Sequence, residues 1–137
     1  MDYLAEFAHV PISVLLGMRL VERTAEECNV ALTPSPQHVQ SEGFVQGGVL
    51  AALADAAAVY LLLPELPPER TVTSIEFKLN FLKPALVGAG DLEARARPVQ
   101  RGRMIALCEV DVSQADRLVA KGLFTYVYRD RRPVREG

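Results

Sequence analysis

The chain has no tryptophan, only two cysteines and two histidines, and no large excess of either sign of charge. With 137 residues and a formal net charge of −2, it lacks the basic field that binding to nucleic acid or to an anionic membrane requires. Cys28 and Cys108 form no C-x-x-C pair, and His9 and His38 lie at no metal-ligand spacing. We therefore expect buried thiols, no disulfide, no metal and no cofactor.

Long hydrophobic runs are also missing. Met1 to Glu6 has acidic residues where a signal peptide has basic ones, and the apolar segment Val49 to Leu63 is interrupted by Asp55 and too short to span a bilayer. Half of the residues are hydrophobic and 23% are charged, which is enough apolar surface for one core. These features predict a single cytoplasmic domain, residues 1–137, without a membrane partner.

Two common hydrolase signatures are absent as well. The sequence contains neither a G-x-S-x-G elbow nor a G-x-x-x-x-G-K-[ST] phosphate loop. Serine-hydrolase and nucleotide-hydrolase functions are therefore not supported.

What the chain does have is a series of short alternating segments. Apolar spacing typical of a helix covers residues 3–16, with a break at Pro11. A longer helix is predicted over Val49 to Leu63, which is rich in Ala and Leu and has no internal Gly or Pro. Alternation predicts six strands, over residues 18–23, 27–33, 72–82, 91–100, 104–112 and 118–128. The core is thus expected over residues 17–128, followed by a charged, frayed tail over 129–137.

One long apolar helix and six strands, four of them consecutive, predict an α+β fold. In this fold an antiparallel six-stranded sheet wraps around the long central helix. Alternation makes the strand 72–82 half-buried, with one apolar face and one polar face. The apolar face is expected to contain Ile75, Phe77, Leu79 and Phe81, and the polar face Ser74, Glu76, Lys78 and Asn80.

The segment from Gln40 to Asp55 combines a polar loop, a glycine pair and a helix with one carboxylate. Gly47 and Gly48 stand where the helix begins, so their N–H groups lack intrahelical partners and lie at the positive end of the helix dipole. Glycine also lets a ligand atom approach these donors closely. Asp55 interrupts an otherwise apolar helix, where a carboxylate needs a partner or a function. The segment therefore predicts an oxyanion site at the start of the helix. From the residues alone, Asp55 is expected to pair with a loop donor, to face solvent at an interface, or to act as a reactive carboxylate.

Three blocks of the sequence match the pattern of one known family. The pattern N-x-x-G-x-x-H-G-G-x-x-x-x-L-x-D is filled by Gln40, Gly43, Gln46, Gly47, Gly48, Leu53 and Asp55. Residues 73–85 match a strand that ends in N-F-x-x-P-A, and residues 101–103 match a basic turn near bound coenzyme A. In these blocks the chain resembles the hotdog-fold thioesterases of the phenylacetic-acid-degradation (PaaI-like) family over residues 17–128. The resemblance implies a hotdog fold and hydrolysis of acyl-CoA.

The resemblance also implies catalytic roles for individual residues. Asp55 would act as general base on water or attack the thioester directly, and the Gly47 N–H, with that of Gly48, would stabilise the oxyanion. Gln40, where the family has asparagine, would orient the carbonyl or the water. Ser74 stands where relatives have a hydroxyl that holds the attacking water, with Thr73 as the adjacent alternative.

Further residues are expected to bind the coenzyme A part of the substrate. Gln46 replaces the family's histidine, cannot titrate near neutral pH, and would cap the helix or contact the pantetheine arm. Lys83, Arg101 and Arg103 are candidates to bind the phosphates, although each is equally compatible with a solvated charge.

Helix geometry indicates that one chain cannot form a complete site. Gly47 and Asp55 lie eight residues apart, or roughly 12 Å along the axis, whereas both must act within about 3 Å of one carbonyl. Two helices antiparallel across a two-fold axis would bring Asp55 of one near Gly47 of the other. The resemblance likewise implies a homodimer as the minimal unit and a homotetramer as the assembly.

The sequence thus predicts an acyl-CoA thioesterase that releases a free acid and coenzyme A, with an aromatic, short or medium acyl group. The alternative is a non-catalytic hotdog protein that binds acyl-CoA as a sensor or carrier. Gln46 in place of histidine favours the alternative, whereas the presence of Asp55 argues against it.

Overall fold

The computed structural model describes residues 2–132. Its helices are α1 (Tyr3–Phe7), α2 (Pro11–Leu16) and α3 (Gly47–Leu62), with 3-10 turns η1 (Pro36–His38) and η2 (Leu63–Glu65). Its strands are β1 (Met18–Arg23), β2 (Cys28–Leu32), β3 (Arg70–Phe81), β4 (Leu92–Arg101), β5 (Ile105–Gln114) and β6 (Arg117–Asp130). All six predicted strands are present, with ends within two residues of the predicted ones.

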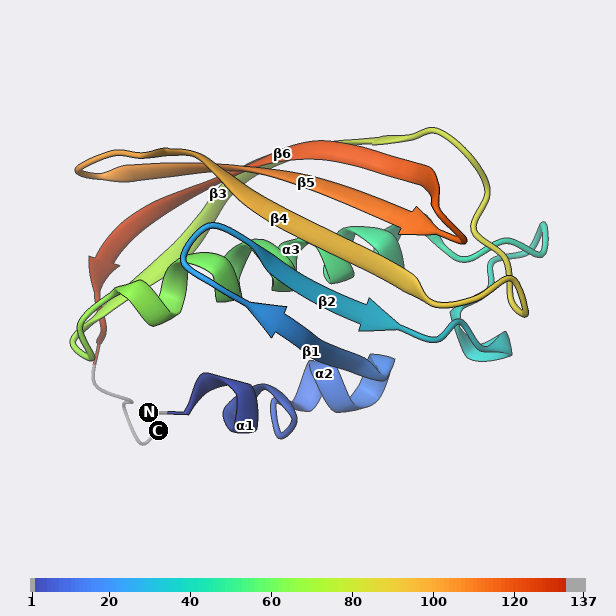
Figure 1. Ribbon diagram of the computed structural model, residues 1–137, viewed down its shortest axis with the longest axis horizontal. Coiled ribbons are helices and arrows are strands. Elements are labelled where there is room, and N and C mark those ends of the chain that lie inside the picture. The colour runs from blue at the N-terminus through green and yellow to red at the C-terminus, as the bar shows by residue number, and fades with distance from the viewer. Residues whose placement is uncertain (1, 133–137) are drawn as a thin grey trace.

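A single antiparallel sheet, in the order β1-β2-β4-β5-β6-β3, curves around α3 (Figure 1). The helix is apolar on nearly all sides because the sheet encloses it, and its buried residues are Leu50, Leu53, Ala54, Ala57, Ala58, Tyr60, Leu61 and Leu62. The predicted α+β hotdog architecture is therefore confirmed.

The segment Gly47–Glu65 spans 19 residues with a mean hydropathy of 1.7, so by length and composition it could cross a membrane. The prediction that the apolar segment is too short was wrong, because the helix begins two residues before Val49 and continues into η2. Its position explains its composition. Leu53 and Leu61 have no exposed surface beneath the sheet, as expected for the core helix of a globular domain.

The edge strand β3 is more exposed than the half-buried strand predicted. Ile75, Phe77 and Phe81 are 54%, 49% and 56% exposed, because no further strand pairs with this edge in the described chain and α3 covers β3 only in part. The pairing with β6 shifts between Ser74 and Glu76, which leaves Ile75 without a cross-strand partner. This bulge reverses the alternation, so Ser74 lies opposite the fully buried Tyr126 and faces α3. The prediction that Ser74 lies on the polar face was wrong for this reason.

The two ends of the chain also differ from the prediction. Residues 3–16 form two short helices because Pro11 has no N–H and begins a helix more readily than it continues one. At the other end, Arg129 and Asp130 belong to β6 rather than to a frayed tail. Arg131 follows β6 and donates its backbone N–H to Glu69 O at 2.8 Å, so it too is held in place. Residues 133–137 of the predicted tail lie outside the described residues.

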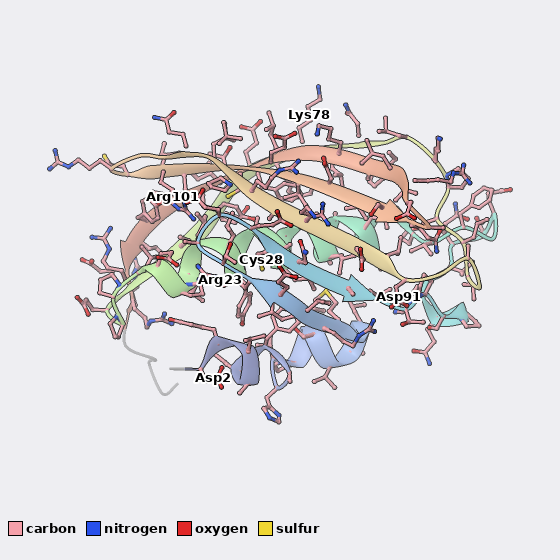
Figure 2. The ribbon with its side chains drawn as sticks, in the orientation of Figure 1. Asp2, Arg23, Cys28, Lys78, Asp91 and Arg101 are labelled. Atoms are coloured by element: carbon pink, nitrogen blue, oxygen red, sulfur yellow. The ribbon has the colours of Figure 1, made fainter. Side chains whose placement is uncertain are left out.

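Arg23 of β1 fixes the C-terminal end of α3 (Figure 2). Its Nε donates to Tyr60 O at 2.9 Å and its Nη2 to Leu61 O at 2.7 Å, while Nη1 pairs with Glu65 at 2.9 Å. The guanidinium thus satisfies carbonyls that the helix leaves free and lies at the negative end of its dipole.

The two cysteines are free, buried thiols, as predicted. Both Cys28 and Cys108 have no exposed surface. Burial raises the pKa of Cys28 to about 12 and that of Cys108 to about 11, so both thiols stay neutral at physiological pH.

Candidate active site

The start of α3 presents backbone donors next to an aromatic ring. The first helical hydrogen bonds come from Val49 and Leu50, which donate to Gln46 O, so the N–H groups of Gly47 and Gly48 precede the helical ladder. A Cβ added to Gly47 would lie 3.0 Å from the Cζ atom of Phe81, which shows that the ring packs directly against this glycine.

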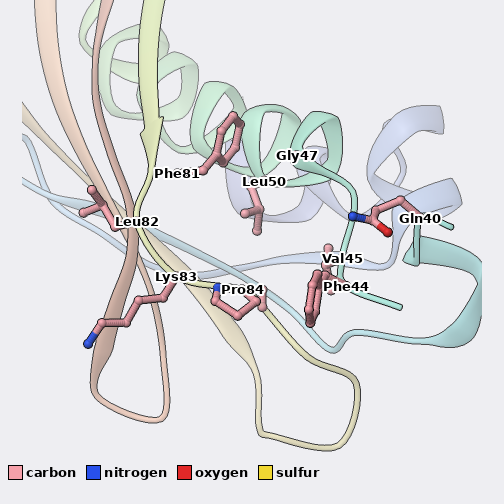
Figure 3. A pocket seen from close by; sticks show the side chains of 10 residues that line it. Gln40, Phe44, Val45, Gly47, Leu50, Phe81, Leu82, Lys83 and Pro84 are labelled. Carbon is pink, nitrogen blue, oxygen red and sulfur yellow. The ribbon is translucent and has the colours of Figure 1, made fainter. Parts of the chain in front are cut away.

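A cavity of about 440 Å³ opens beside this helix start (Figure 3). Its wall is mostly apolar, and its lining residues are Gln40, Phe44, Val45, Gly47, Leu50, Phe81, Leu82, Lys83, Pro84 and Ala85. The structure therefore brings three of the predicted site residues, Gln40, Gly47 and Lys83, to the wall of one hollow.

A buried glutamine holds the loop that follows the cavity residues Pro84 and Ala85. Gln114, at the end of β5, donates to Leu86 O at 2.7 Å and to Gly90 O at 2.9 Å, and accepts from the Leu86 N–H at 3.0 Å. These bonds fix the segment after Pro84, and Ala85 O accepts from the Val45 N–H at 2.9 Å. The loop on one side of the cavity is thereby tied to the loop that leads into α3.

The amide of Gln40 has a defined orientation. Its Oε1 accepts from the backbone N–H of Glu42. Its Nε2 is turned toward the start of α3 (Figure 3). Gln40 thus presents a donor, rather than an acceptor, on the side of the cavity where the Gly47 N–H lies.

Gln46 is the N-cap residue of α3, but its side chain makes no capping hydrogen bond. The loop is instead held by its backbone, since the Gln46 N–H donates to His38 O at 2.8 Å. Of the two predicted roles of the Gln46 side chain, capping of the helix was therefore wrong, and the N–H groups of Gly47 and Gly48 receive no side-chain cap from it. The predicted contact with a pantetheine arm stays a prediction.

Asp55 lies midway along α3 and outside the cavity. The hydroxyl of Tyr126, on β6, donates to Asp55 Oδ1 at 2.6 Å. Tyr126 is fully buried, and burial, followed by the charge of Asp55, raises the pKa of its phenol, which keeps it a donor. The hydrogen bond fixes one carboxylate oxygen and leaves Oδ2 for another partner.

Ser74 and Thr73 lie on opposite sides of the sheet. Ser74 is the cross-strand partner of Tyr126, so its hydroxyl is on the α3 side with the Asp55 carboxylate. Thr73 pairs with Val127, and its hydroxyl accepts a hydrogen bond from Arg129. Of the two alternatives, the geometry favours Ser74.

The three basic residues predicted to bind the coenzyme A phosphates do not lie close together. Lys83 belongs to the cavity wall, but its ammonium points away from the hollow in Figure 3. Arg101 donates to Ala25 O and lies 3.5 Å from Glu26, so it holds the turn between β1 and β2. Arg103 lies in the turn between β4 and β5, beside a second apolar hollow with Met104. The geometry makes Arg101 a structural residue and leaves Arg103 available for a ligand.

Tyr126 is the site residue that sequence reasoning missed. It appears in the sequence as one apolar position of an alternating strand, and only the pairing of β6 with β3 brings it to Asp55. The signal that could have found it was a tyrosine on the helix-facing side of a strand, since a buried phenol needs a hydrogen-bond partner.

The site contains no cluster of metal ligands. Within residues 2–132 the structure shows no group of three or more His, Cys, Asp or Glu side chains that could hold a metal ion. The groups available for chemistry are thus a positioned carboxylate on one part of α3 and a set of neutral donors at its start.

This geometry agrees with comparisons to known proteins. A family model described as "Thioesterase superfamily" matches residues 42–121. "Putative esterase ComA2" of Bacillus subtilis (strain 168) is 31% identical over 108 residues, which cover 76% of this chain and 82% of that protein.

Solved structures extend the similarity to the fold. The chain superposes on thioesterase HI1161 of Haemophilus influenzae with a TM-score of 0.84 and 21% identity, covering 91% of this chain and 87% of that one. For a mutant of the phenylacetic acid degradation protein PaaI of Thermus thermophilus, the TM-score is 0.79 with 28% identity, and 86% of this chain and 98% of that one are covered. The chain therefore belongs to the thioesterase superfamily and shares the hotdog fold of its PaaI-like members.

Proposed function

We propose that this protein hydrolyses acyl-CoA thioesters to a free acid and coenzyme A, at sites formed between two copies of the chain. The observation that carries the proposal is the division of the chemical groups along α3. The oxyanion donors lie at its start, whereas the hydrogen-bonded Asp55 lies two turns further on, roughly 12 Å away along the axis.

The uncovered edge of the sheet supports the dimer. Strand β3 ends the sheet, and three of its apolar side chains, Ile75, Phe77 and Phe81, are about half exposed. A second copy pairing antiparallel along this strand would cover them and place Asp55 of one subunit near Gly47 of the other. A homotetramer and a cytoplasmic location stay predictions.

In this mechanism the thioester oxygen accepts hydrogen bonds from the Gly47 N–H and from Gln40 Nε2. Asp55 of the other subunit, oriented by Tyr126, uses its free Oδ2 to take a proton from water, whose oxygen adds to the carbonyl; the C–S bond then breaks and the coenzyme A sulfur leaves with that proton. In direct attack, Oδ2 displaces the coenzyme A thiolate to form a mixed anhydride, which water hydrolyses to the free acid and Asp55. Ser74, on the same side of the sheet, would hold that water. The negative charge that develops on the oxygen is stabilised by fixed donors at the positive end of the helix dipole.

The first test is Asp55→Asn, assayed with a panel of acyl-CoAs by release of the thiol. Hydrolysis should fall by at least about a hundredfold while circular dichroism shows an intact fold, because asparagine cannot accept the proton or attack. Unchanged turnover would refute the role of Asp55. Binding of acyl-CoA by calorimetry without hydrolysis by the wild type would instead support a sensor or carrier, the function that Gln46 in place of histidine favours.

The second test asks whether the site is shared. Gly47→Pro removes the N–H, suits the first position of a helix, and follows an extended Gln46 that is compatible with proline. Its Cβ would lie 3.0 Å from Phe81 Cζ, so circular dichroism must first show that the variant folds before it is mixed. Mixed and refolded with Asp55→Asn, this inactive variant should give about a quarter of wild-type activity, since about half of the dimers are mixed and each has one intact site of two. A mixture as inactive as its components would contradict the shared site.

A further inference from the structure

We propose that Phe81 determines which acyl chains the site accepts, by closing one side of the cavity at the Gly47 N–H. This inference rests on the proposed function and goes further by assigning a selectivity role to a side chain that takes no part in the bond-breaking step.

The position of the ring follows from strand pairing. Phe81 is the last residue of β3 and lies opposite the buried Ala120 of β6, so its side chain faces α3. The ring packs against Gly47, with three of its atoms within 3.4 Å of where a Cβ on that residue would be. A side chain at position 47 would therefore be in tight contact with this ring.

The contact with Phe81 leaves little room for a side chain at position 47. The positive-φ glycines of the described chain are Gly17, Gly43, Gly88 and Gly90, so Gly47 has a backbone conformation that any residue can adopt. At position 47 a Cβ would lie 3.0 Å from Phe81 Cζ, so the ring would have to move by a few tenths of an ångström to admit a side chain there. The start of α3 and the end of β3 are thus in direct contact at Gly47, whose N–H is expected to bind the thioester oxygen.

The cavity continues from this contact as an apolar passage. Leu50, one turn after Gly47, and Phe44, from the preceding loop, line it together with Phe81 (Figure 3). An acyl group whose thioester oxygen lies on the Gly47 N–H would enter this hollow, because the alternative is to leave its methylenes in water. The ring of Phe81 then limits the width of the passage and keeps water from the donor.

The two proposed effects of Phe81, limiting the width of the passage and keeping water from the Gly47 N–H, should change different kinetic parameters. Phe81→Ala should widen the passage, so that the ratio of kcat/KM for dodecanoyl-CoA to that for butanoyl-CoA rises by about tenfold or more. It should also lower kcat for butanoyl-CoA, because water reaches the Gly47 N–H and weakens its bond to the oxyanion. Phe81→Leu keeps an apolar side chain at the wall and should give an intermediate ratio.

The matched control is Phe77→Ala on the same strand. Phe77 has a similar exposure, faces the same way and stacks on Phe124 at 5.1 Å, but it does not line the cavity. It should change the chain-length ratio by less than about twofold, even if pairing along β3 is weakened. An equal change in both variants would overturn the proposal, as would an unchanged ratio in Phe81→Ala.

A binding measurement separates this inference from the proposed function. In the Asp55→Asn background, the affinity for the same acyl-CoAs by calorimetry should show the same shift toward long chains when Phe81 is replaced by alanine. Continued hydrolysis by Asp55→Asn would refute the catalytic proposal alone. Affinities that keep the wild-type order of chain length would refute the role of Phe81 alone.

Discussion

Replacing Tyr126 with phenylalanine removes one oxygen atom from the structure and with it the only hydrogen bond to the Asp55 carboxylate that the described residues provide. The side chain is fully buried, so the ring should stay in place and the fold should be kept. The lost bond is short, at 2.6 Å, and joins a neutral donor to a charged acceptor. Such bonds are worth about 1.5–3 kcal/mol, but water can replace the phenol because Asp55 is only partly buried.

We expect kcat for acyl-CoA hydrolysis to fall by about tenfold to a hundredfold, which corresponds to about 1.4–2.7 kcal/mol, with KM within about threefold of the wild-type value. The loss falls on kcat because the carboxylate is less well oriented in the transition state, while the groups that bind the substrate are unchanged. Thiol release measured over a range of substrate concentrations gives both constants, and urea unfolding reports on stability.

The control is Tyr128→Phe, two residues along on the same face of β6. This variant should keep wild-type kcat. If Tyr126→Phe retains full activity with an intact fold, then Asp55 is not oriented by Tyr126 in any step that limits turnover. Because burial and Asp55 raise the pKa of Tyr126 above its ordinary value of 10, the wild type should also show no loss of activity from phenol ionisation up to that pH.

Three further predictions concern stability. Arg23→Ala should lower the free energy of unfolding by about 2–3 kcal/mol, since it leaves two carbonyls at the end of α3 unpaired. Arg19→Ala, which breaks an exposed ion pair, should lower it by less than about 1 kcal/mol. Urea unfolding of both variants tests this difference. The pKa of Cys28 rises on folding from 9 to about 12, so above pH 9 unfolding releases a proton from this thiol. The free energy of unfolding should therefore fall by up to about 4 kcal/mol as the pH rises from 9 to 12. A Cys28→Ala variant with an equal pH dependence of stability would contradict this prediction. Gly47→Ala should destabilise the wild type by about 1–2 kcal/mol but cost much less in a Phe81→Ala background, and additive effects in this double-mutant cycle would rule out the proposed contact.

The elements of this fold were predictable because hydrophobic periodicity determines them locally. The strand 105–114 buries every second residue against α3, and the long helix has no internal Gly or Pro before it ends. The bulge at Ile75 was not predictable, since nothing in an alternating run marks where one residue loses its partner. That single residue decides on which side of the sheet Ser74 lies.

The candidate site likewise contains residues that local sequence could place and residues that only the tertiary packing brings together. Gln40 and Gly47 are close in sequence to the helix start, so a local pattern was sufficient to place them together. Tyr126 is 71 residues from Asp55, and the two meet only through the packing of β6 on α3. Arg101 was predicted to bind a ligand from its position in a basic turn, but the carbonyl of Ala25 that engages it comes from a distant part of the chain.

The hydrogen bonds between Gln114 and the loop after Pro84 have a consequence for substrate binding. Three hydrogen bonds to one interior amide hold this loop without any contribution from a bound molecule. Little backbone freedom is then lost on association, because the chain gave it up when the domain folded. A glutamine at the far end of a neighbouring strand thus pre-organises the hollow, and its replacement would weaken substrate affinity without touching a single atom of the substrate.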